Sequence, residues 1–171
     1  MKPAKKLART VAPVPEGYHT VTACLTIRGA GQAIEFYRKV FGAELLDRVD
    51  GPDGKSVMHA ALRIGDSRVF LADEMPGMGC RSPESLGGPT GSIYLYVDDA
   101  DGVVKKAVEA GATLRQPVTV MFWGDRFGSV ADPFGCVWDV ATHVEDVPAG
   151  ELRKRAEAFV REMAPGSRDT D

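Results

Sequence analysis

The chain has 171 residues, of which 44% are hydrophobic and 26% are charged. This composition is ordinary for one globular domain, or for two small repeats fused into one, and it argues against disorder. The formal net charge of −3 is not the basic excess expected of a nucleic-acid-binding protein, and the apolar runs are far shorter than the roughly 20 residues of a membrane-spanning helix. We therefore expect no nucleic-acid partner and no membrane partner.

Residues 1–17 are basic, rich in proline and without a hydrophobic pattern, which predicts a flexible leader. They contain no apolar run long enough for a secretory signal. The basic residues could touch an acidic partner, although a solvated tail is the simpler interpretation. The three cysteines, Cys24, Cys80 and Cys136, are widely spaced, which fits free thiols in a reducing compartment. The sequence therefore predicts a cytoplasmic protein.

The first half of the chain predicts a strand, a helix and three further strands. Residues 21–27 alternate between apolar and polar, which is typical of a half-buried strand. Apolar residues then recur at helical spacing over 33–41, and Gly42 stands where a helix would end. Three strands follow, over residues 43–49, 57–64 and 68–72.

The second half repeats the same order of elements. A strand over 92–97 precedes a helix that Asp98 or Asp99 can cap and that ends at Gly111. Strands are then predicted over residues 112–120, 126–131 and 137–142. Because a single unit of this kind leaves one face of its sheet bare, we expect the two units to pair.

The predicted organisation has three parts. They are a flexible leader over 1–17, a domain over 18–145, and a C-terminal helix and tail over 146–171. Within the domain, modules 18–74 and 90–143 are joined by the loop 75–89, which is rich in glycine, proline and serine. The segment 148–163 has an amphipathic helical pattern, and we expect it to pack on the domain or on a second subunit.

Strand alternation also assigns the two faces of each sheet. The helices must cover the apolar side, so the polar and aromatic residues of each strand are expected to face a concave side. This inward group consists of Thr22, Cys24, Thr26, His59, Ala61, Arg63, Phe70, Ser92, Tyr94, Tyr96 and Asp139. A polar and aromatic lining suits a small-molecule site rather than a packed barrel interior.

The segment order resembles the vicinal oxygen chelate superfamily, and most closely its PhnB-like, glyoxalase/bleomycin-resistance-like branch. The segments that carry the resemblance, within about residues 15–145, are AIEFYRKVFGAELL, GPDGKSVMHAALRIGDSRVFLADE, RSPESLGG, WGDRFG and DPFGCVW. The resemblance implies an α+β fold in which two paired βαβββ modules form an eight-stranded half-open cup with the helices outside. It also implies a homodimer.

The resemblance further implies where a metal ion would bind. Metal-dependent members use four ligands, typically His and Glu, from the first and last strands of each module. The corresponding positions here are Thr22, Phe70, Ser92 and Asp139. Only Asp139 is a credible ligand, because hydroxyl groups are weak neutral donors and Phe offers none. We therefore expect no metal cofactor, with a relocated divalent-metal site on His59, Asp139 and Cys24 as the alternative.

Individual side chains allow more than one interpretation. Asp139 could bind a cationic ligand or act as a general base, or it could form a buried ion pair with Arg126 or Arg63. His59 could be an acid/base group or a hydrogen-bonded histidine of the sheet. Trp123 is expected to stack on a planar ligand, and Arg126 could hold its anionic group.

Asp125 and Arg126 could instead serve to fix the geometry of the hairpin that follows Trp123, and this structural interpretation is the one we favour for Asp125. His143, at the end of the last strand, is expected to be exposed.

The leading prediction is metal-independent binding of a small, partly aromatic molecule in the cup. The predicted ligand-binding residues are Thr22, Phe70, Ser92, Tyr94, Tyr96, Trp123, Arg126 and Asp139. The alternative is a metal-dependent lyase, isomerase or dioxygenase with a rearranged metal site, for which His59 and Asp139 are the catalytic candidates. A third possibility is a scaffold subunit whose cup is occluded.

Overall fold

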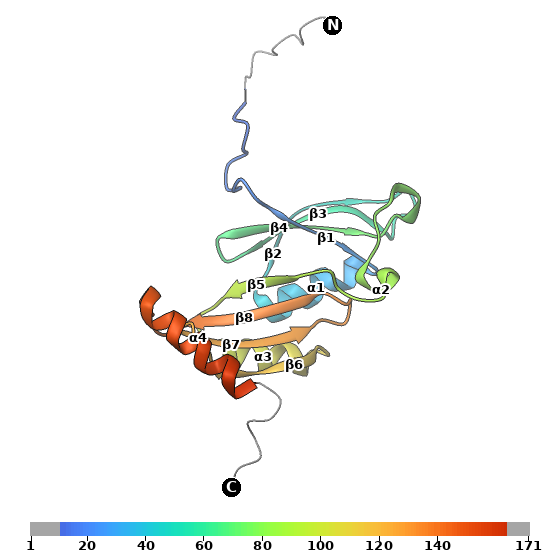
Figure 1. Cartoon of the computed structure of the whole chain (residues 1–171). Coiled ribbons are helices and arrows are strands. Elements are labelled where there is room, and N and C mark those ends of the chain that lie inside the picture. Colours follow the sequence, from blue (N-terminus) through green and yellow to red (C-terminus); the bar gives the residue numbers. More distant parts are fainter. Residues whose placement is uncertain (1–10, 164–171) are drawn as a thin grey trace, which may run out of the picture. The chain divides into compact units, whose positions relative to one another are not determined.

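The structure is a computed structural model that describes residues 11–163 (Figure 1). The predicted leader 1–17 and the predicted tail therefore lie partly outside the described residues. The chain divides between Ser82 and Pro83 into two compact units, each with its own four-stranded sheet. None of the described helices is both long and apolar enough to cross a membrane.

The first unit has the predicted order of one strand, one helix and three strands. Its elements are β1 (Ala23–Ile27), α1 (Ala30–Phe41), β2 (Glu44–Asp50), β3 (Val57–Ile64) and β4 (Ser67–Asp73). The strand order in the sheet is β1-β4-β3-β2, with β1 parallel to β4 and the other pairs antiparallel. A strand–helix crossover is what allows the first strand to lie parallel to the last one.

Helix α1 covers one face of this sheet. Its residues Ile34, Tyr37 and Val40 are buried, and the covered face carries Leu62 and Leu71, which are fully buried. Apolar residues at helical spacing meet apolar residues at strand spacing, so this packing follows directly from the two sequence periodicities.

Strand alternation also assigns Val21 and Met58 to the helix side, but neither contributes to this core. Val21 precedes the first residue of β1 and is 85% exposed, and Met58 at the beginning of β3 is 47% exposed. Alternation assigns a face to these residues but cannot show that the covering helix extends as far as the strand ends.

Asp73 holds the beginning of α1 in place. Gly29, the residue that precedes the helix, has no side chain that could cap it. Instead, Asp73 Oδ1 accepts hydrogen bonds from the backbone N–H groups of Gly29 and Ala30, each at 2.9 Å. Asp73 Oδ2 accepts a third from the N–H of Val57 at 2.7 Å. One carboxylate at the end of β4 therefore satisfies donors from the α1 terminus and from β3.

The second unit repeats this arrangement and adds a helix at each end. Its elements are α2 (Pro83–Leu86), β5 (Ser92–Tyr96), α3 (Ala100–Glu109), β6 (Thr113–Val120), β7 (Asp125–Ala131), β8 (Val137–His143) and α4 (Ala149–Met163). The strand order is β5-β8-β7-β6, with β5 parallel to β8. The duplicated βαβββ order and the C-terminal helix are thus confirmed. The predicted loop 75–89 contains α2 and a single 3-10 turn over Pro76–Met78.

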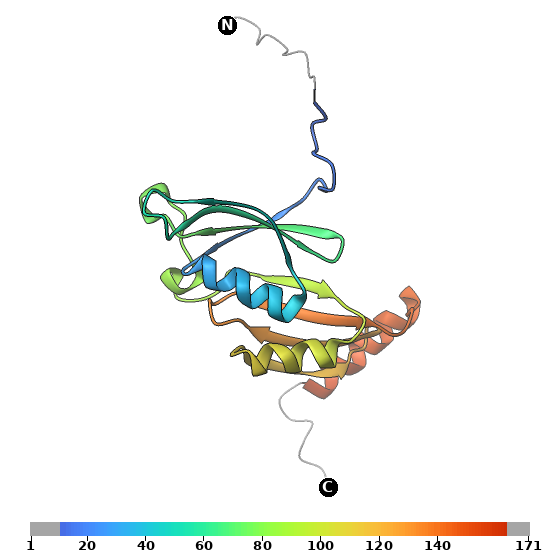
Figure 2. The same ribbon diagram turned by 180° about the vertical axis from the view of Figure 1, so that it is seen from behind.

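Helices α3 and α4 lie on opposite faces of the second sheet (Figures 1 and 2). The α3 side carries Trp138 and Val140, both fully buried. On the other side, Phe159 of α4 packs against Phe127 and Ala141. The predicted amphipathic helix therefore packs on its own domain and covers part of the face that was expected to be open.

The Asp73→Ala substitution is expected to destabilise the chain by about 1–3 kcal/mol, because it leaves three backbone donors without their acceptor. Urea unfolding followed by circular dichroism would measure this change. Asp66→Ala is the control: Asp66 is exposed and accepts only from the neighbouring Ser67 hydroxyl, so its loss should change stability by less than about 0.5 kcal/mol. Equal effects of the two substitutions would contradict this capping role.

Candidate functional site

The face of the second sheet opposite α3 carries most of the predicted site residues. The pairing register sets Tyr94 of β5 beside Asp139 of β8, and Asp139 beside Ser129 of β7. Cross-strand partners point to the same face, so these side chains form one row across the sheet. Asp139 lies in the middle of this row, on the side that alternation predicts.

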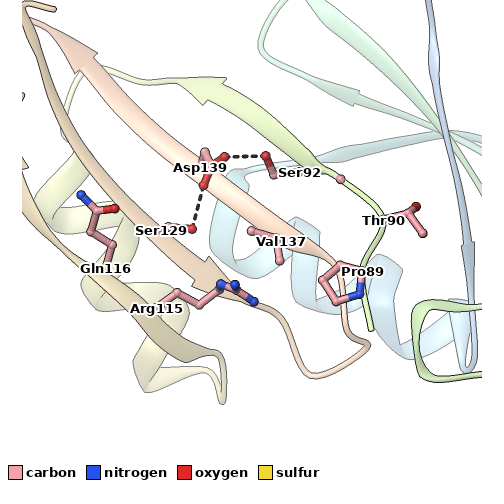
Figure 3. Close-up of a pocket in the computed structure, with 9 residues that line it drawn as sticks. Pro89, Thr90, Ser92, Arg115, Gln116, Ser129, Val137 and Asp139 are labelled. Carbon is pink, nitrogen blue, oxygen red and sulfur yellow. Dashed lines mark hydrogen bonds between the residues drawn. The ribbon is translucent and has the colours of Figure 1, made fainter. Parts of the chain in front are cut away.

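A pocket of about 540 Å³ surrounds Asp139 (Figure 3). It is lined by Pro89, Thr90, Gly91, Ser92, Arg115, Gln116, Ser129, Val137 and Asp139. All of these residues belong to the second unit. Its lining is mainly polar, and the segment just before β5 forms one of its walls.

Two serine hydroxyls hold the Asp139 carboxylate. Ser92 Oγ donates to Oδ2, and Ser129 Oγ donates to Oδ1 at 2.7 Å. The serines come from the strands on either side of β8, so the carboxylate is fixed from both directions.

The arginines proposed as ion-pair partners of Asp139 are engaged elsewhere. Arg63 pairs with Glu44 in the first unit. Arg126 lies opposite Thr142 in the β7–β8 register and binds Asp101 of α3, with Nη2 at 2.7 Å from Oδ1. The ion-pair interpretation of Asp139 is therefore wrong. Arg126 is on the helix-covered face, away from the side chains with which it was grouped.

Arg115 lines the pocket although it was not among the predicted ligand-binding residues. It lies where the β6–β7 register shifts between Leu114 and Gln116. Such an irregularity breaks simple alternation, so counting along the strand cannot assign a face to Arg115. Within residues 11–163 its guanidinium group has no hydrogen-bond or ion-pair partner.

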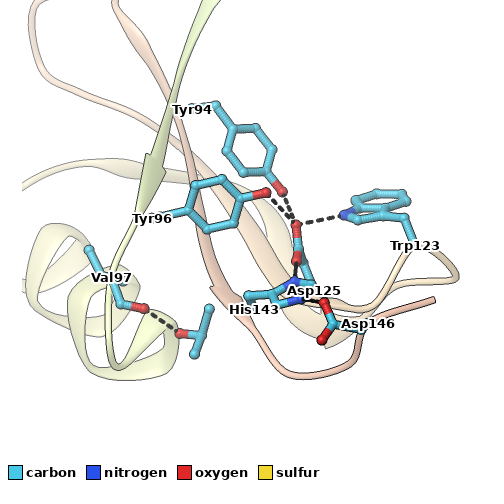
Figure 4. A network of polar contacts seen from close by, with 8 residues as sticks. Tyr94, Tyr96, Val97, Trp123, Asp125, His143 and Asp146 are labelled. Carbon is cyan, nitrogen blue, oxygen red and sulfur yellow. Dashed lines mark hydrogen bonds and ion pairs between the residues drawn. The ribbon is translucent and has the colours of Figure 1, made fainter. Parts of the chain in front are cut away.

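A second polar cluster centres on Asp125, whose side chain is only 3% exposed (Figure 4). Asp125 Oδ2 accepts hydrogen bonds from Tyr94 Oη at 2.9 Å, Tyr96 Oη at 3.0 Å and Trp123 Nε1 at 3.1 Å. Its Oδ1 lies 2.8 Å from His143 Nδ1. Three residues predicted to bind a ligand therefore have their polar atoms tied to one buried carboxylate. Asp125 contacts residues of β5 and β8 as well as Trp123, so its role is wider than fixing the hairpin.

These contacts shift four pKa values, including that of Tyr96, which the hydrogen bond to Asp125 raises. Burial alone would raise the pKa of Asp125, but hydrogen bonds from His143 and the two tyrosines outweigh it and hold the pKa below its ordinary value. Burial and the hydrogen bond to Asp125 raise the pKa of Tyr94. The pKa of His143 is also raised, because its ring hydrogen-bonds to Asp125 and to Asp146, 3.1 Å from Nε2. His143 is half exposed, as predicted, but it belongs to this cluster.

Aromatic rings fill the same end of the sheet face. Tyr94 stacks on Phe127 with ring centroids 5.6 Å apart, and Trp123 meets Phe127 edge-on at the same separation. Phe159 of α4 lies 5.2 Å from the Phe122 ring. Trp123 is thereby partly buried next to α4, whereas Tyr94 remains 42% exposed. Of these aromatic residues, Tyr94 is the cross-strand neighbour of Asp139 in the register.

The remaining predicted site residues belong to the first unit. Thr22 precedes β1. Phe70 lies opposite Cys24 in the β1–β4 register, and its ring centroid is 5.0 Å from that of His59 and 5.5 Å from that of Tyr18. His59 and Phe70 thus share the face that α1 leaves uncovered, as alternation predicts.

The side chains at the four implied metal positions do not fit a divalent ion. Phe70 has no donor atom, Thr22 is a neutral hydroxyl, and Ser92 is a hydroxyl that donates to Asp139. Among the described residues, no group of three or more His, Cys, Asp or Glu side chains is arranged to hold a metal ion. In the alternative set, Cys24 and His59 belong to the first unit and Asp139 to the second, so this set stays a prediction.

The raised pKa of His143 predicts a pH-dependent stability. The folded chain binds this proton more tightly than the unfolded chain, so the stabilisation is complete below the ordinary pKa of 6.5 and is lost as the pH rises through the raised pKa. Between about pH 6 and pH 9, the melting temperature of the wild type should fall more than that of His143→Gln. His19→Gln, at an exposed histidine, should behave as the wild type. The prediction fails if the two variants show the same pH profile.

Comparisons with known proteins agree with this fold. The family model of the Glyoxalase/Bleomycin resistance protein/Dioxygenase superfamily matches residues 19–140. An uncharacterized protein of Mycobacterium tuberculosis is 46% identical over 132 residues, which cover 75% of this chain and 77% of that protein.

Two solved structures extend the comparison. TioX from a Micromonospora species is 25% identical with a TM-score of 0.55, covering 72% of this chain and 99% of TioX. A PhnB protein from Bacillus cereus is 18% identical with a TM-score of 0.57 over 72% of this chain and 99% of that chain, which shows the shared fold alone. With its duplicated βαβββ units and the matched family model, the chain belongs to the Glyoxalase/Bleomycin resistance protein/Dioxygenase superfamily.

Proposed function

We propose that this protein binds a small, partly aromatic organic molecule without the help of a metal ion, in the pocket around Asp139. The observation that carries this proposal is a fixed carboxylate at the centre of a concave, polar pocket on a sheet face that α3 leaves free. The fold itself does not decide the chemistry, because one fold can host many functions. The proposal therefore depends on the side chains of the pocket.

The size and lining of the pocket suit a small molecule. Its volume of about 540 Å³ falls within the range of about 300–1,000 Å³ that is usual for such sites. Asp139 and Arg115 supply opposite charges, and Val137 and Pro89 supply apolar surface. A few polar groups in fixed positions are what orient a ligand in such a pocket.

We assign the aromatic contact to Tyr94, which lies outside the lining of the pocket but on the same sheet face. It is the cross-strand neighbour of Asp139, and it is 42% exposed. Its hydroxyl is held by Asp125 and its ring by Phe127, so the ring is already oriented before a ligand arrives. An aromatic pair contributes about 0.5–1.5 kcal/mol beyond the area that it buries, and a pre-oriented ring avoids part of the entropic cost of binding.

Five residues expected to bind the ligand are left out of the proposal. Thr22 and Phe70 belong to the first unit, and the Tyr96 hydroxyl is bound to Asp125. Arg126 is paired with Asp101 on the helix-covered face, and Trp123 is partly buried among aromatic side chains next to α4. The negatively charged end of a ligand is assigned to Arg115 instead. Ser92 stays in the set as a residue that positions Asp139.

The metal-independent part of the proposal rests on the donor chemistry of the implied ligand positions. One carboxylate with two hydroxyls and a phenyl ring does not provide the three or four strong donors that a divalent ion needs. Elemental analysis of protein purified without chelators tests this point. Stoichiometric zinc, nickel, manganese or iron that is lost in Asp139→Asn would overturn it and favour the metal-dependent enzyme.

A ligand screen by thermal shift tests binding itself, with a panel of aromatic amines, aromatic acids and neutral aromatic compounds. A compound at about 100 times its Kd should stabilise the wild type by about 2.7 kcal/mol, and Asp139→Ala should lose most of that gain. Asp66→Ala, at an exposed turn, should keep it. If no compound raises the melting temperature, or if Asp139→Ala responds like the wild type, the proposal fails.

A further inference from the structure

Building on the proposed function, we infer that the ligand is a zwitterion, with a protonated amine that binds Asp139 and an anionic group that binds Arg115. This inference names the class of molecule that the pocket selects. It follows from the hydrogen-bond acceptors that the side chains around Asp139 present, and from the opposite charges of Asp139 and Arg115 (Figure 3).

The centre of the pocket offers hydrogen-bond acceptors. A carboxylate only accepts, and a serine hydroxyl has a single proton to donate. Ser92 and Ser129 each direct that proton to Asp139. What the three side chains present to a ligand is therefore a set of oxygen lone pairs.

A protonated amine matches this set. It carries three N–H donors and no acceptor, and its positive charge strengthens each hydrogen bond to a carboxylate. A ligand carboxylate or carbonyl at the same place would be repelled, because its oxygen lone pairs would meet the lone pairs of the protein with no proton between them. The hydrogen-bonded group of Ser92, Asp139 and Ser129 thus selects for an amine and against an acid.

Arg115 provides the complementary charge. Its side chain lines the same pocket, and it has no hydrogen-bond or ion-pair partner in the part of the chain that the structure describes. A guanidinium group binds a carboxylate or a phosphate through two parallel hydrogen bonds.

No ion pair joins Arg115 to Asp139 among the described residues, so neither charge neutralises the other. Both remain available to one ligand. Val137 lies on the same face of β8 as Asp139 and supplies apolar surface to the pocket, which suits a short carbon skeleton between the two charged ends.

Four probes with related phenyl skeletons test the inference: phenylalanine carries both charges, phenethylamine only the positive charge, 3-phenylpropionate only the negative charge, and 2-phenylethanol neither. Binding of each to the full chain is measured by titration with NMR detection. Phenylalanine is expected to bind most tightly, followed by phenethylamine, with 3-phenylpropionate and 2-phenylethanol weaker by about tenfold or more.

Two charge-removing variants assign the contacts. Asp139→Asn should weaken phenylalanine and phenethylamine by about tenfold and leave 3-phenylpropionate unchanged or improved. Arg115→Gln should weaken phenylalanine and 3-phenylpropionate and leave phenethylamine unchanged. Lys39→Gln removes an exposed cation of α1 and should change none of the four. Melting curves without ligand show whether each variant folds. If Asp139→Asn does not fold, the ranking of the four probes on the wild type tests the inference.

The outcomes separate the two proposals. If 3-phenylpropionate or 2-phenylethanol binds as tightly as phenylalanine and depends on the pocket, the zwitterion inference is overturned while small-molecule binding stands. The same holds if phenylalanine binds and neither charge-removing variant weakens it. If none of the four probes binds and the wider aromatic panel also gives no thermal shift, both proposals are overturned.

Discussion

Each repeat of this chain supplies one helix for a sheet that has two faces. In the second unit α3 covers the face that carries Trp138 and Val140, and the apolar residues of the other face must be covered by another element. The chain meets this constraint with α4, whose Phe159 packs on Phe127 at one end of that face. The row around Asp139, at the other end, is where the chain forms a pocket. The two ends of this face therefore differ: α4 covers one end, and a pocket lies at the other.

Two carboxylates on this same face show how surroundings decide what an aspartate does. Asp125 is almost fully buried, and donors from Tyr94, Tyr96, Trp123 and His143 use both of its oxygens. A buried charge with this many donors is satisfied inside the protein, so it organises the aromatic end of the sheet.

Within the described part of the chain, Asp139 has two serine partners, and it opens into a pocket. It retains lone pairs that a ligand can use, because an ionised carboxylate can accept about four hydrogen bonds. The two aspartates share a residue type and a sheet face, and they differ in how much of their hydrogen-bonding capacity the fold has already used.

Alternation and the internal repeat determined most of the fold from the sequence alone, because period-2 and period-3.6 patterns are local properties of the chain. The same patterns correctly oriented His59 and Phe70 away from α1, and Asp139 away from α3. Tertiary structure decided the side-chain positions that depend on strand register and on contacts between distant residues. The bulge in β6 brought Arg115 to the pocket, and the β7–β8 register turned Arg126 toward Asp101 of α3. The Asp125 cluster and the seat of α4 depend on contacts between residues far apart in sequence, so only the folded chain could reveal them.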